Sequence, residues 1–433
     1  MAPLDAEWER AWNWPWTLPA LLVLSAFLWL LPRVFLETRV SPVPLLAVSL
    51  TLFFAIGLSV SMIDGYQERA GVRAPAVIMP YTRAPLEYFA DVPAVERAGI
   101  RGFLAKYSKP RLFDRLSLHT RTHPPGGVLF HWLVSRVFGY GLWPAALATI
   151  AFTALTVPLL YFLAREAYGE RVARVALALL LVTPNFVMFT VTSMDGPFSV
   201  FPLLSVWLVR RALRAPRRWV PPALLAGVAM ALAVFMTYAA VFGGLYMALL
   251  AALGARAGET RWRRATAALA VTGGTAVGCH LLLALGTGFD LVSAIRASMA
   301  HDRAMMGTGH ESVGRYLNIS VANLAAFLVF LGIPQAVAWL REVIRGVGPA
   351  LRGRLFDPFV AAGATTILMM ACSTLFTLEV ERVWLFMVPF VVVVAAVHLD
   401  RAREDRRRGE IRTVILLMCL QLFGFELMLR TGW

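Results

Sequence analysis

Long apolar stretches separated by short polar ones run through most of the chain. A helix that crosses a membrane needs about 20 mostly apolar residues. By this measure the pattern predicts twelve spans, at 16–32, 44–62, 141–164, 172–191, 197–212, 219–237, 240–255, 264–288, 316–340, 357–377, 383–399 and 411–429. Because helices and closed barrels are the structures that can cross lipid, we predict an all-α polytopic membrane protein.

The largest piece between predicted spans is the segment 64–140, which is not a simple tether. Part of it repeats apolar residues at i, i+3, i+4 and i+7, as on one face of an amphipathic helix: Ile100, Phe103, Leu104 and Tyr107. Residues 126–138 are also apolar, but 13 residues are too few to span, so we place them in the membrane interface. The pattern therefore divides the chain into two N-terminal spans (1–63), this loop of interfacial helices, and a helical bundle (141–433) with a second loop at 289–315.

Composition agrees with the pattern, since 59% of the 433 residues are hydrophobic and only 15% are charged. The net charge is +15, and all but two of the 41 basic residues are Arg. These Arg residues lie in short clusters between apolar runs, which indicates loop anchoring and not nucleic-acid binding. With 64–140 left aside, alternate loops hold 24 basic residues against 6. The positive-inside rule then places 64–140 and 289–315 on the outer side.

Several classes of site are excluded. The three Cys residues all lie inside apolar runs, so no disulfide framework or Cys metal site is predicted. The longest predicted cytoplasmic loop has 17 residues, too few for a nucleotide-binding domain. The chain contains no P-loop and no Asp-x-Asp pair that would hold a metal with a nucleotide sugar. We therefore predict no cofactor and no metal, and expect the chemistry at the outer membrane surface.

Three aspartates stand at predicted outer ends of spans or helices. Asp64 follows the second apolar run directly, where a half-desolvated carboxylate suits a general base and where a helix C-terminus gives an acid no stabilisation. Asp91 precedes Val-Pro at the start of the amphipathic helix, so it is either an N-cap or a catalytic or acceptor-binding residue. Asp195 precedes Gly-Pro at the start of a span and has the same two interpretations.

Basic residues form the other candidates. His119, Arg121 and His123 lie within five residues and suit a phosphate; the alternative is a polar loop held rigid by Pro124 and Pro125. Two histidines alone make a poor metal site. Glu381 and Arg382 lie in a short outer turn, where the Arg either snorkels beside its neighbour or faces a headgroup phosphate. The second loop allows the same two interpretations, and there we favour solvated side chains, for His301, Asp302, Arg303, His310 and Arg315.

Taken in order, these residues resemble the GT-C glycosyltransferase superfamily, and within it the protein O-mannosyltransferase and aminoarabinose-transferase-like branch. The likeness covers about residues 44–400, and its most specific pieces are His-Pro-Pro-Gly at 123–126 and Glu-Arg-Val-Trp at 381–384. The chain departs from the pattern at Gly65, where a second acid often follows, and at Gly126-Gly127 after the two prolines.

The resemblance implies a polyprenyl-phosphate-linked sugar donor, an active site on the outer face of a prokaryotic cytoplasmic membrane, and Asp64 as the base. The acceptor is a lipid, a glycan or a protein. Such a donor carries its own leaving group, so one carboxylate must take the acceptor proton and cations must stabilise the departing phosphate. Arg121, His123 and Arg382 fit the second role, and a single displacement inverts the anomeric centre. His119, Asp195 and Glu381 complete the predicted cavity. The competing hypothesis is a lipid flippase or transporter, which twelve spans suit equally well.

Overall fold

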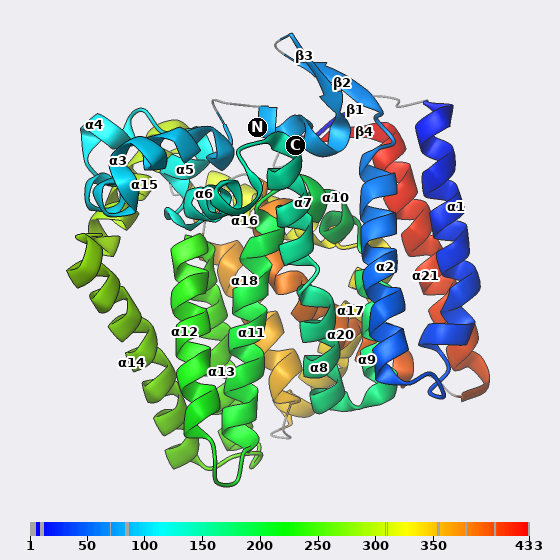
Figure 1. Cartoon of the computed structure of the whole chain (residues 1–433). Helices are drawn as coiled ribbons and strands as arrows, with labels where there is room; N and C mark the ends of the chain where they lie inside the picture. Colours follow the sequence, from blue (N-terminus) through cyan, green and yellow to red (C-terminus); the bar gives the residue numbers. More distant parts are fainter. Residues whose placement is uncertain are drawn as a thin grey trace. The chain divides into compact units, whose positions relative to one another are not determined.

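The computed structural model is built almost entirely of helices (Figure 1). It describes residues 6–8, 13–69, 71–82, 86–307, 309, 311–352, 356–373, 375–376, 379–401 and 404–431. His310, one of the second-loop candidates, lies outside these residues. The prediction of an all-α polytopic membrane protein is confirmed, and the chain is an integral membrane protein.

The chain forms two compact units, each assembled from separate stretches of sequence. Unit 1 comprises Met1–Val77, Thr149–Leu203 and Leu317–Trp433, and unit 2 comprises Ile78–Ala148 and Leu204–Tyr316. Three helices and one 3₁₀ helix run from one stretch into the next: η2 (Ala76–Thr82), α7 (Leu142–Thr153), α11 (Asp195–Arg214) and α16 (Val313–Phe330). The division predicted at residues 63 and 140 separates membrane spans from an outer loop, whereas these units are defined by packing. That division therefore stays a prediction.

Unit 1 contains most of the helices near the two termini. Its helical elements are α1 (Trp14–Leu30), the π-helix η1 (Leu31–Phe35), α2 (Pro42–Ser61), α8 (Thr156–Tyr168), α9 (Glu170–Leu180), α10 (Pro184–Thr192), α17 (Ile333–Leu351), α18 (Pro358–Ser373), α19 (Val380–Val383), η5 (Leu385–Met387), α20 (Val388–Asp400) and α21 (Glu404–Met428). Two short antiparallel pairs join β1 (Ala6–Trp8) to β4 (Leu429–Thr431) and β2 (Tyr66–Arg69) to β3 (Val72–Pro75). The first pair ties the N-terminal strand to the end of α21.

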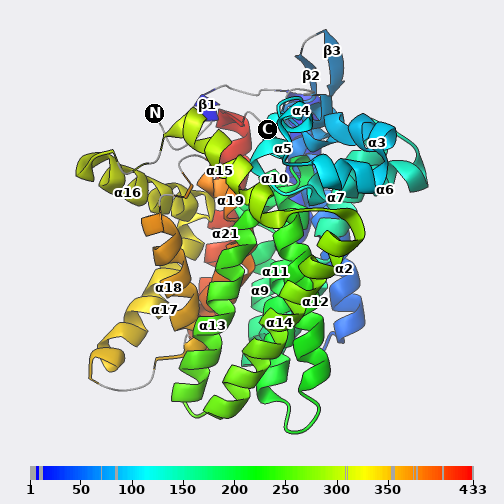
Figure 2. The same ribbon diagram turned by 90° about the vertical axis from the view of Figure 1, so that its left-hand side faces the viewer.

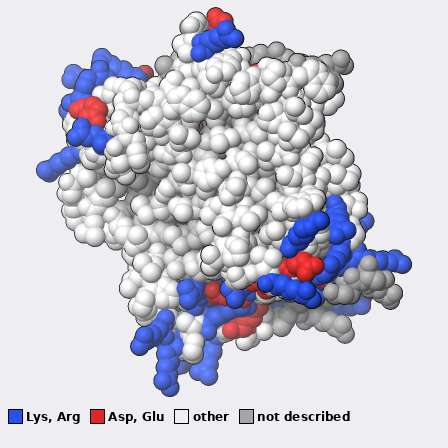
Figure 3. Space-filling view, turned by 45° about the vertical axis from the view of Figure 1, so that its right-hand side comes forward, with Lys and Arg blue, Asp and Glu red and all other residues white. Residues whose placement is uncertain are grey.

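Unit 2 contains the segment predicted to be interfacial. Its elements are η3 (Tyr88–Asp91), α3 (Val92–Lys106), α4 (Pro110–Phe113), α5 (Leu118–Thr122), α6 (Gly126–Phe138), α12 (Val220–Met236), η4 (Tyr238–Ala240), α13 (Val241–Arg256), α14 (Trp262–Thr287) and α15 (Leu291–Met306). Helix α6 has the predicted bounds. Figure 2 shows α12, α13 and α14 running alongside one another. On the face drawn in Figure 3 the charged side chains lie toward the upper and lower margins, and a broad area between them is uncharged.

Fewer helices meet the criterion for a membrane span than the sequence predicted. Among the described residues eight do so, or nine if the bent pair α9–α10 is one span. Three further apolar helices, α6, α12 and α18, have only 13, 17 and 16 residues. Twelve spans are therefore not confirmed. The hydropathy pattern alone counts apolar stretches, and it cannot tell a short buried helix from one that crosses the bilayer.

The predicted span 316–340 has the wrong bounds, because it runs across the end of one helix and the start of the next. Helix α16 ends at Phe330 and α17 begins at Ile333, with Gly332 at φ 95° between them. Gln421 of α21 compensates for the break: its Nε2 donates to the Val329 carbonyl and its Oε1 accepts from the Ile333 amide, both at 2.8 Å. A break within an apolar stretch needs such partners, since lipid supplies none.

Candidate functional site

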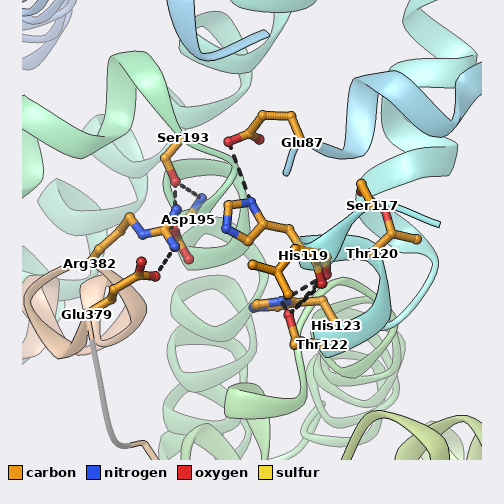
Figure 4. Close-up of polar contacts among 11 residues, drawn as sticks. Glu87, Ser117, His119, Thr120, Thr122, His123, Ser193, Asp195, Glu379 and Arg382 are labelled. Carbon is orange, nitrogen blue, oxygen red and sulfur yellow. Dashed lines mark hydrogen bonds and ion pairs between the residues drawn. The ribbon is translucent and has the colours of Figure 1, made fainter. Parts of the chain in front are cut away.

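The predicted site residues form two clusters, one in each unit. Asp91, His119, Arg121 and His123 lie in unit 2, whereas Asp64, Asp195, Glu381 and Arg382 lie in unit 1. Figure 4 draws the polar contacts within the clusters. The expectation that residues of both clusters share one outward cavity stays a prediction.

Asp91 holds the start of the short helix α5 in unit 2. Its Oδ2 accepts a hydrogen bond from the Ser117 amide at 2.9 Å, although 26 residues separate the two. The Ser117 and Thr120 hydroxyls lie 2.9 Å apart beside it. Asp91 occupies the N-cap position of α3, but its side chain makes no capping hydrogen bond there. The N-cap interpretation therefore named the wrong helix. The Asp91 carboxylate accepts a hydrogen bond at the start of α5 and makes none at the start of α3.

Tyr107 fastens the other end of the same segment. Its buried hydroxyl lies 2.5 Å from the Thr120 carbonyl and 2.7 Å from the His123 carbonyl. Phe103, Leu104 and Tyr107 are buried as the amphipathic pattern predicts, but Ile100 is 40% exposed. Ile100 directly follows Gly99, whose φ of 65° interrupts α3. The predicted apolar face is therefore correct at three of its four residues.

The two histidines of the segment pack on either side of one aromatic ring. The Tyr88 ring lies 5.8 Å, centroid to centroid, from both His119 and His123. His119 Nδ1 is 3.5 Å from a carboxylate oxygen of Glu87, a residue that the sequence analysis missed. His123 Nδ1 is 3.2 Å from the His119 carbonyl. Together with the hydrogen bonds of Asp91 and Tyr107, these contacts hold the backbone of residues 117–123 in place.

The two glycines that depart from the family pattern have a steric cause. A Cβ on Gly126 would lie 2.3 Å from the Phe235 carbonyl oxygen, and one on Gly127 would lie 2.8 Å from the Tyr88 ring. Residues 126 and 127 therefore have to be glycine for α6 to begin where it does. Their absent side chains let the His-Pro-Pro turn pack closely against Tyr88.

Arg121 has a donor that the fold leaves unused. Its guanidinium Nε is buried and has no hydrogen-bond partner among the described residues, although its charge acts on Asp91. His301 of α15, half-buried and 6.1 Å from the Phe113 ring, has a pKa lowered by burial and then by the nearby charge of Arg121. His301 is thus less solvated than the sequence analysis favoured. Arg315, in contrast, forms a partly exposed ion pair with Glu311 at 3.1 Å.

In unit 1, Arg382 is buried between two carboxylates. Its Nε lies 3.4 Å from Asp195 Oδ2, and its Nη2 donates to Glu379 (Figure 4). The Arg382 side chain is only 6% exposed, so the snorkelling interpretation is wrong. Ser193 is hydrogen-bonded to the Asp195 carboxylate, and its hydroxyl oxygen accepts from the Asp195 amide at 3.1 Å. The short turn α19 therefore carries a compensated charge.

Arg382 has a carboxylate partner besides the neighbouring Glu381 that the sequence suggested. Glu381 is buried, and its backbone carbonyl accepts from Asn185 Nδ2 at 3.0 Å. The carboxylate partner is Glu379, three residues before Arg382, a spacing that the sequence offered as readily. Glu379 has φ 58° and is the one non-glycine residue with positive φ in the described part of the chain. Such a conformation is uncommon for a residue with a Cβ and often marks a functional position.

Asp64 lies in the turn that follows α2. Its Oδ2 accepts from Gln67 Nε2 at 2.8 Å, and its side chain is partly exposed. Gly65 has φ 67°, and a Cβ there would lie 2.5 Å from Asn13 and 2.8 Å from Trp16. The first turn of α1 thus occupies the space that a second acid would need, which explains this departure from the family pattern.

Comparison with known proteins agrees with the predicted resemblance. The family described as dolichyl-phosphate-mannose-protein mannosyltransferase matches residues 122–282. No curated protein matches the chain. ArnT from Cupriavidus metallidurans bound to undecaprenyl phosphate is similar in structure, with a TM-score of 0.52 and 14% identity over 84% of this chain and 61% of ArnT. Its apo state gives a TM-score of 0.51 and 14% identity over 84% and 62%.

The chain therefore has the fold of ArnT, and the resemblance to GT-C glycosyltransferases is confirmed. It spans about three fifths of the length of ArnT. At this identity the likeness concerns the fold. The chemistry has to be argued from the residues that the chain itself carries.

The tie between Asp91 and Ser117 predicts how substitutions of Asp91 affect stability. Asp91→Asn keeps an acceptor for the Ser117 amide, whereas Asp91→Leu leaves that buried donor unsatisfied at a cost of about 1–3 kcal/mol. We expect the Leu variant to have the lower Tm at pH 7. If both variants melt together, the hydrogen bond does not support α5.

The pH dependence of these melting temperatures provides a second check. Burial raises the pKa of Asp91 above 3.8, against the opposing hydrogen bonds from Thr120 and Ser117 and the charge of Arg121. The folded chain thus binds this proton more tightly than the unfolded chain does. The Asp91 contribution to stability should fall as pH rises from 3.8 through the folded pKa, and Asp91→Asn should lack that component.

Proposed function

We propose that this chain is a GT-C-type membrane glycosyltransferase that uses a polyprenyl-phosphate-linked sugar. In this proposal it works at the outer face of a prokaryotic cytoplasmic membrane and transfers the sugar to a lipid, glycan or protein acceptor. The matched mannosyltransferase family and the fold of ArnT, which has been captured with undecaprenyl phosphate, support this class of reaction.

The observation that carries the proposal is the state of Arg121. A buried guanidinium N–H without a partner is costly, and a ligand that accepts from it recovers that cost. Phosphate oxygens, like carboxylate oxygens, match the planar donors of Arg. His119 and His123, from the same rigid segment, add further donors. Asp91, Tyr107 and Tyr88 hold the backbone that carries these donors in place. A ligand therefore does not have to order the segment when it binds.

The reaction needs few groups. The acceptor oxygen attacks the anomeric carbon as the bond from that carbon to the phosphate oxygen breaks, and the electron pair leaves with the phosphate. The acceptor proton passes to the Asp64 carboxylate. One displacement inverts the anomeric centre, and no general acid is required because phosphate is already a good leaving group. The polyprenyl tail stays in the bilayer, which accounts for a site at membrane level.

Arg382 takes part in a different way from Arg121 in this proposal. Its charge is compensated by Asp195 and Glu379. A carboxylate presents oxygens to a guanidinium much as a phosphate does. We therefore assign Glu379, whose backbone has positive φ, as an internal carboxylate that occupies the Arg382 donors until the donor phosphate replaces it.

Substitution of Asp64 tests the function itself. Asp64→Asn keeps the size and the hydrogen bond from Gln67, but it is a far poorer proton acceptor, so transfer should fall by about 10²–10⁴. The assay is transfer from a polyprenyl-phosphate sugar in proteoliposomes, with product linkage determined. A flippase would move lipid without forming a glycosidic bond.

Asp91→Asn is the matched control for this assay, because it preserves the Ser117 hydrogen bond and should retain transfer. An active Asp64→Asn beside an inactive Asp91→Asn would make Asp91 the base. Full activity in both variants would contradict the mechanism.

Substitution of Glu379 tests the proposed competition at Arg382. Glu379→Gln removes the competing negative charge and should lower the KM for the donor by roughly threefold to tenfold, a change of about 1 kcal/mol. Glu311→Gln is the control, since it removes the carboxylate of another Arg–Glu pair. An unchanged KM in an active Glu379→Gln enzyme would make the Arg382 pair purely structural.

A further inference from the structure

Two neighbouring turns at one end of unit 2 concentrate positive charge. One joins α11 to α12 and the other joins α13 to α14. Figures 1 and 2 show the two turns side by side. Residues 210–219 and 256–264 hold nine Arg and a single acid, Glu259. We call these two stretches the basic platform. Its charge is far larger than one glutamate can balance.

Hydrogen bonds lock the two turns of the basic platform together. Arg264 donates to the Ala215 carbonyl and, at 3.3 Å, to the Pro216 carbonyl. The Thr260 hydroxyl donates to the Leu213 carbonyl at 3.1 Å. The Arg264 guanidinium also lies 5.1 Å from the centroid of the Trp219 ring. The platform is therefore a fixed surface and not two independent loops.

Most of its cations are exposed and not used within the fold. Arg217, Arg218, Arg256, Arg261 and Arg263 are exposed, and none of them makes an ion pair with another described residue. Arg214 is the member paired with Glu259, at 3.3 Å. Exposed arginines held on a rigid frame are suited to bind phosphate groups in pairs.

Some arginines near helix ends of unit 1 are used differently. Arg174 is almost fully buried and donates to Glu170 at 2.7 Å and to the Glu37 carbonyl at 2.7 Å. Arg401 and Glu342 pair at 3.1 Å. The fold can thus compensate an arginine charge near a helix end. Five arginines of the basic platform have no such compensation and are gathered on two neighbouring turns.

The platform also lies at the ends of two candidate membrane spans. Arg256 ends one candidate span and Trp262 begins the next, so both stand at the boundary of an apolar helix. Trp262 is 56% exposed, as expected for an aromatic residue in the interface between membrane and water. Basic surfaces at this depth recognise anionic headgroups.

We infer that the basic platform binds the headgroup phosphates of anionic glycerophospholipids in the leaflet that it faces. This is a lipid site separate from the residues assigned to sugar transfer, and it does not depend on that proposed function.

The test compares two triple variants of the full-length protein with equal loss of charge. Arg217→Gln, Arg218→Gln and Arg263→Gln together remove part of the platform. Arg39→Gln, Arg341→Gln and Arg412→Gln together are the control, since these are exposed residues of unit 1. Binding of phosphatidylglycerol and of phosphatidylcholine is titrated and counted by native mass spectrometry, and melting curves verify folding.

We expect the parent and the control to prefer phosphatidylglycerol, and the platform variant to bind it about a hundredfold more weakly, because each Arg near an anionic surface contributes a factor of about five. Equal binding of the two lipids by the parent, or equal loss in both variants, would overturn the inference. If the platform variant does not fold, the salt dependence of lipid binding to the parent is measured instead. Added NaCl should weaken phosphatidylglycerol binding and leave phosphatidylcholine binding unchanged. Salt-insensitive binding would also overturn it.

Discussion

The need to satisfy backbone hydrogen bonds in lipid governs this structure. A peptide group in hydrocarbon has no water to bond, so the chain is helical nearly throughout and polar chemistry is restricted to the ends and breaks of helices. The break between α16 and α17 shows the cost of an exception, since Gln421 has to reach it from α21 and satisfy groups on both sides. Every candidate site residue accordingly lies in a turn, in a short helix or at a helix end.

Within this constraint the two clusters differ in how their arginine is paired. In unit 1 the buried guanidinium of Arg382 contacts the carboxylates of Asp195 and Glu379. In unit 2 the segment from His119 to His123 is rich in donors, and Arg121 retains an unused N–H. A transfer reaction from a phosphate-linked sugar needs both kinds of group: acids for the acceptor and cations for the leaving phosphate.

Rigidity is the second property that the unit 2 cluster contributes. Tyr88 and Asp91 of η3, together with Tyr107 at the end of α3, contact a stretch of seven residues, 117–123. Gly126 and Gly127 permit this packing because a side chain at either position would collide with its neighbours. A site whose donors are already held in place loses less entropy when a ligand binds, and its dipoles need not reorganise as charge moves.

Much of the fold was predictable from the sequence because lipid imposes a simple rule on it. The membrane class, the helix at 126–138 and the burial of Phe103, Leu104 and Tyr107 follow from apolar pattern and length alone. The break at Gly332 was not predictable, since its compensation comes from Gln421, 88 residues away from Ile333. Local pattern contains no record of such distant partners.

The candidate site shows the same limit. The residue types of His119, Arg121, Asp195 and Arg382 indicated a site with phosphate-binding cations and a carboxylate. The hydrogen-bond and ion-pair partners of these residues could not be predicted from the sequence. Asp91 looked like the cap of the helix beside it, because the capping rule is local, whereas its partner is 26 residues along the chain. The sequence suggested Glu381 beside Arg382, whereas the pairing with Glu379 depends on the turn of α19.

The measurement that tests the central claim most directly compares a polyprenyl phosphate with the corresponding polyprenol as ligands. The two share the tail and differ in the phosphate alone. If Arg121 supplies a phosphate site, the parent should bind the phosphate at least about tenfold more tightly than the alcohol, the worth of one charged hydrogen bond, and Arg121→Gln should remove most of that difference. Equal affinities for phosphate and alcohol in the parent, or a difference that survives in Arg121→Gln, would contradict the claim.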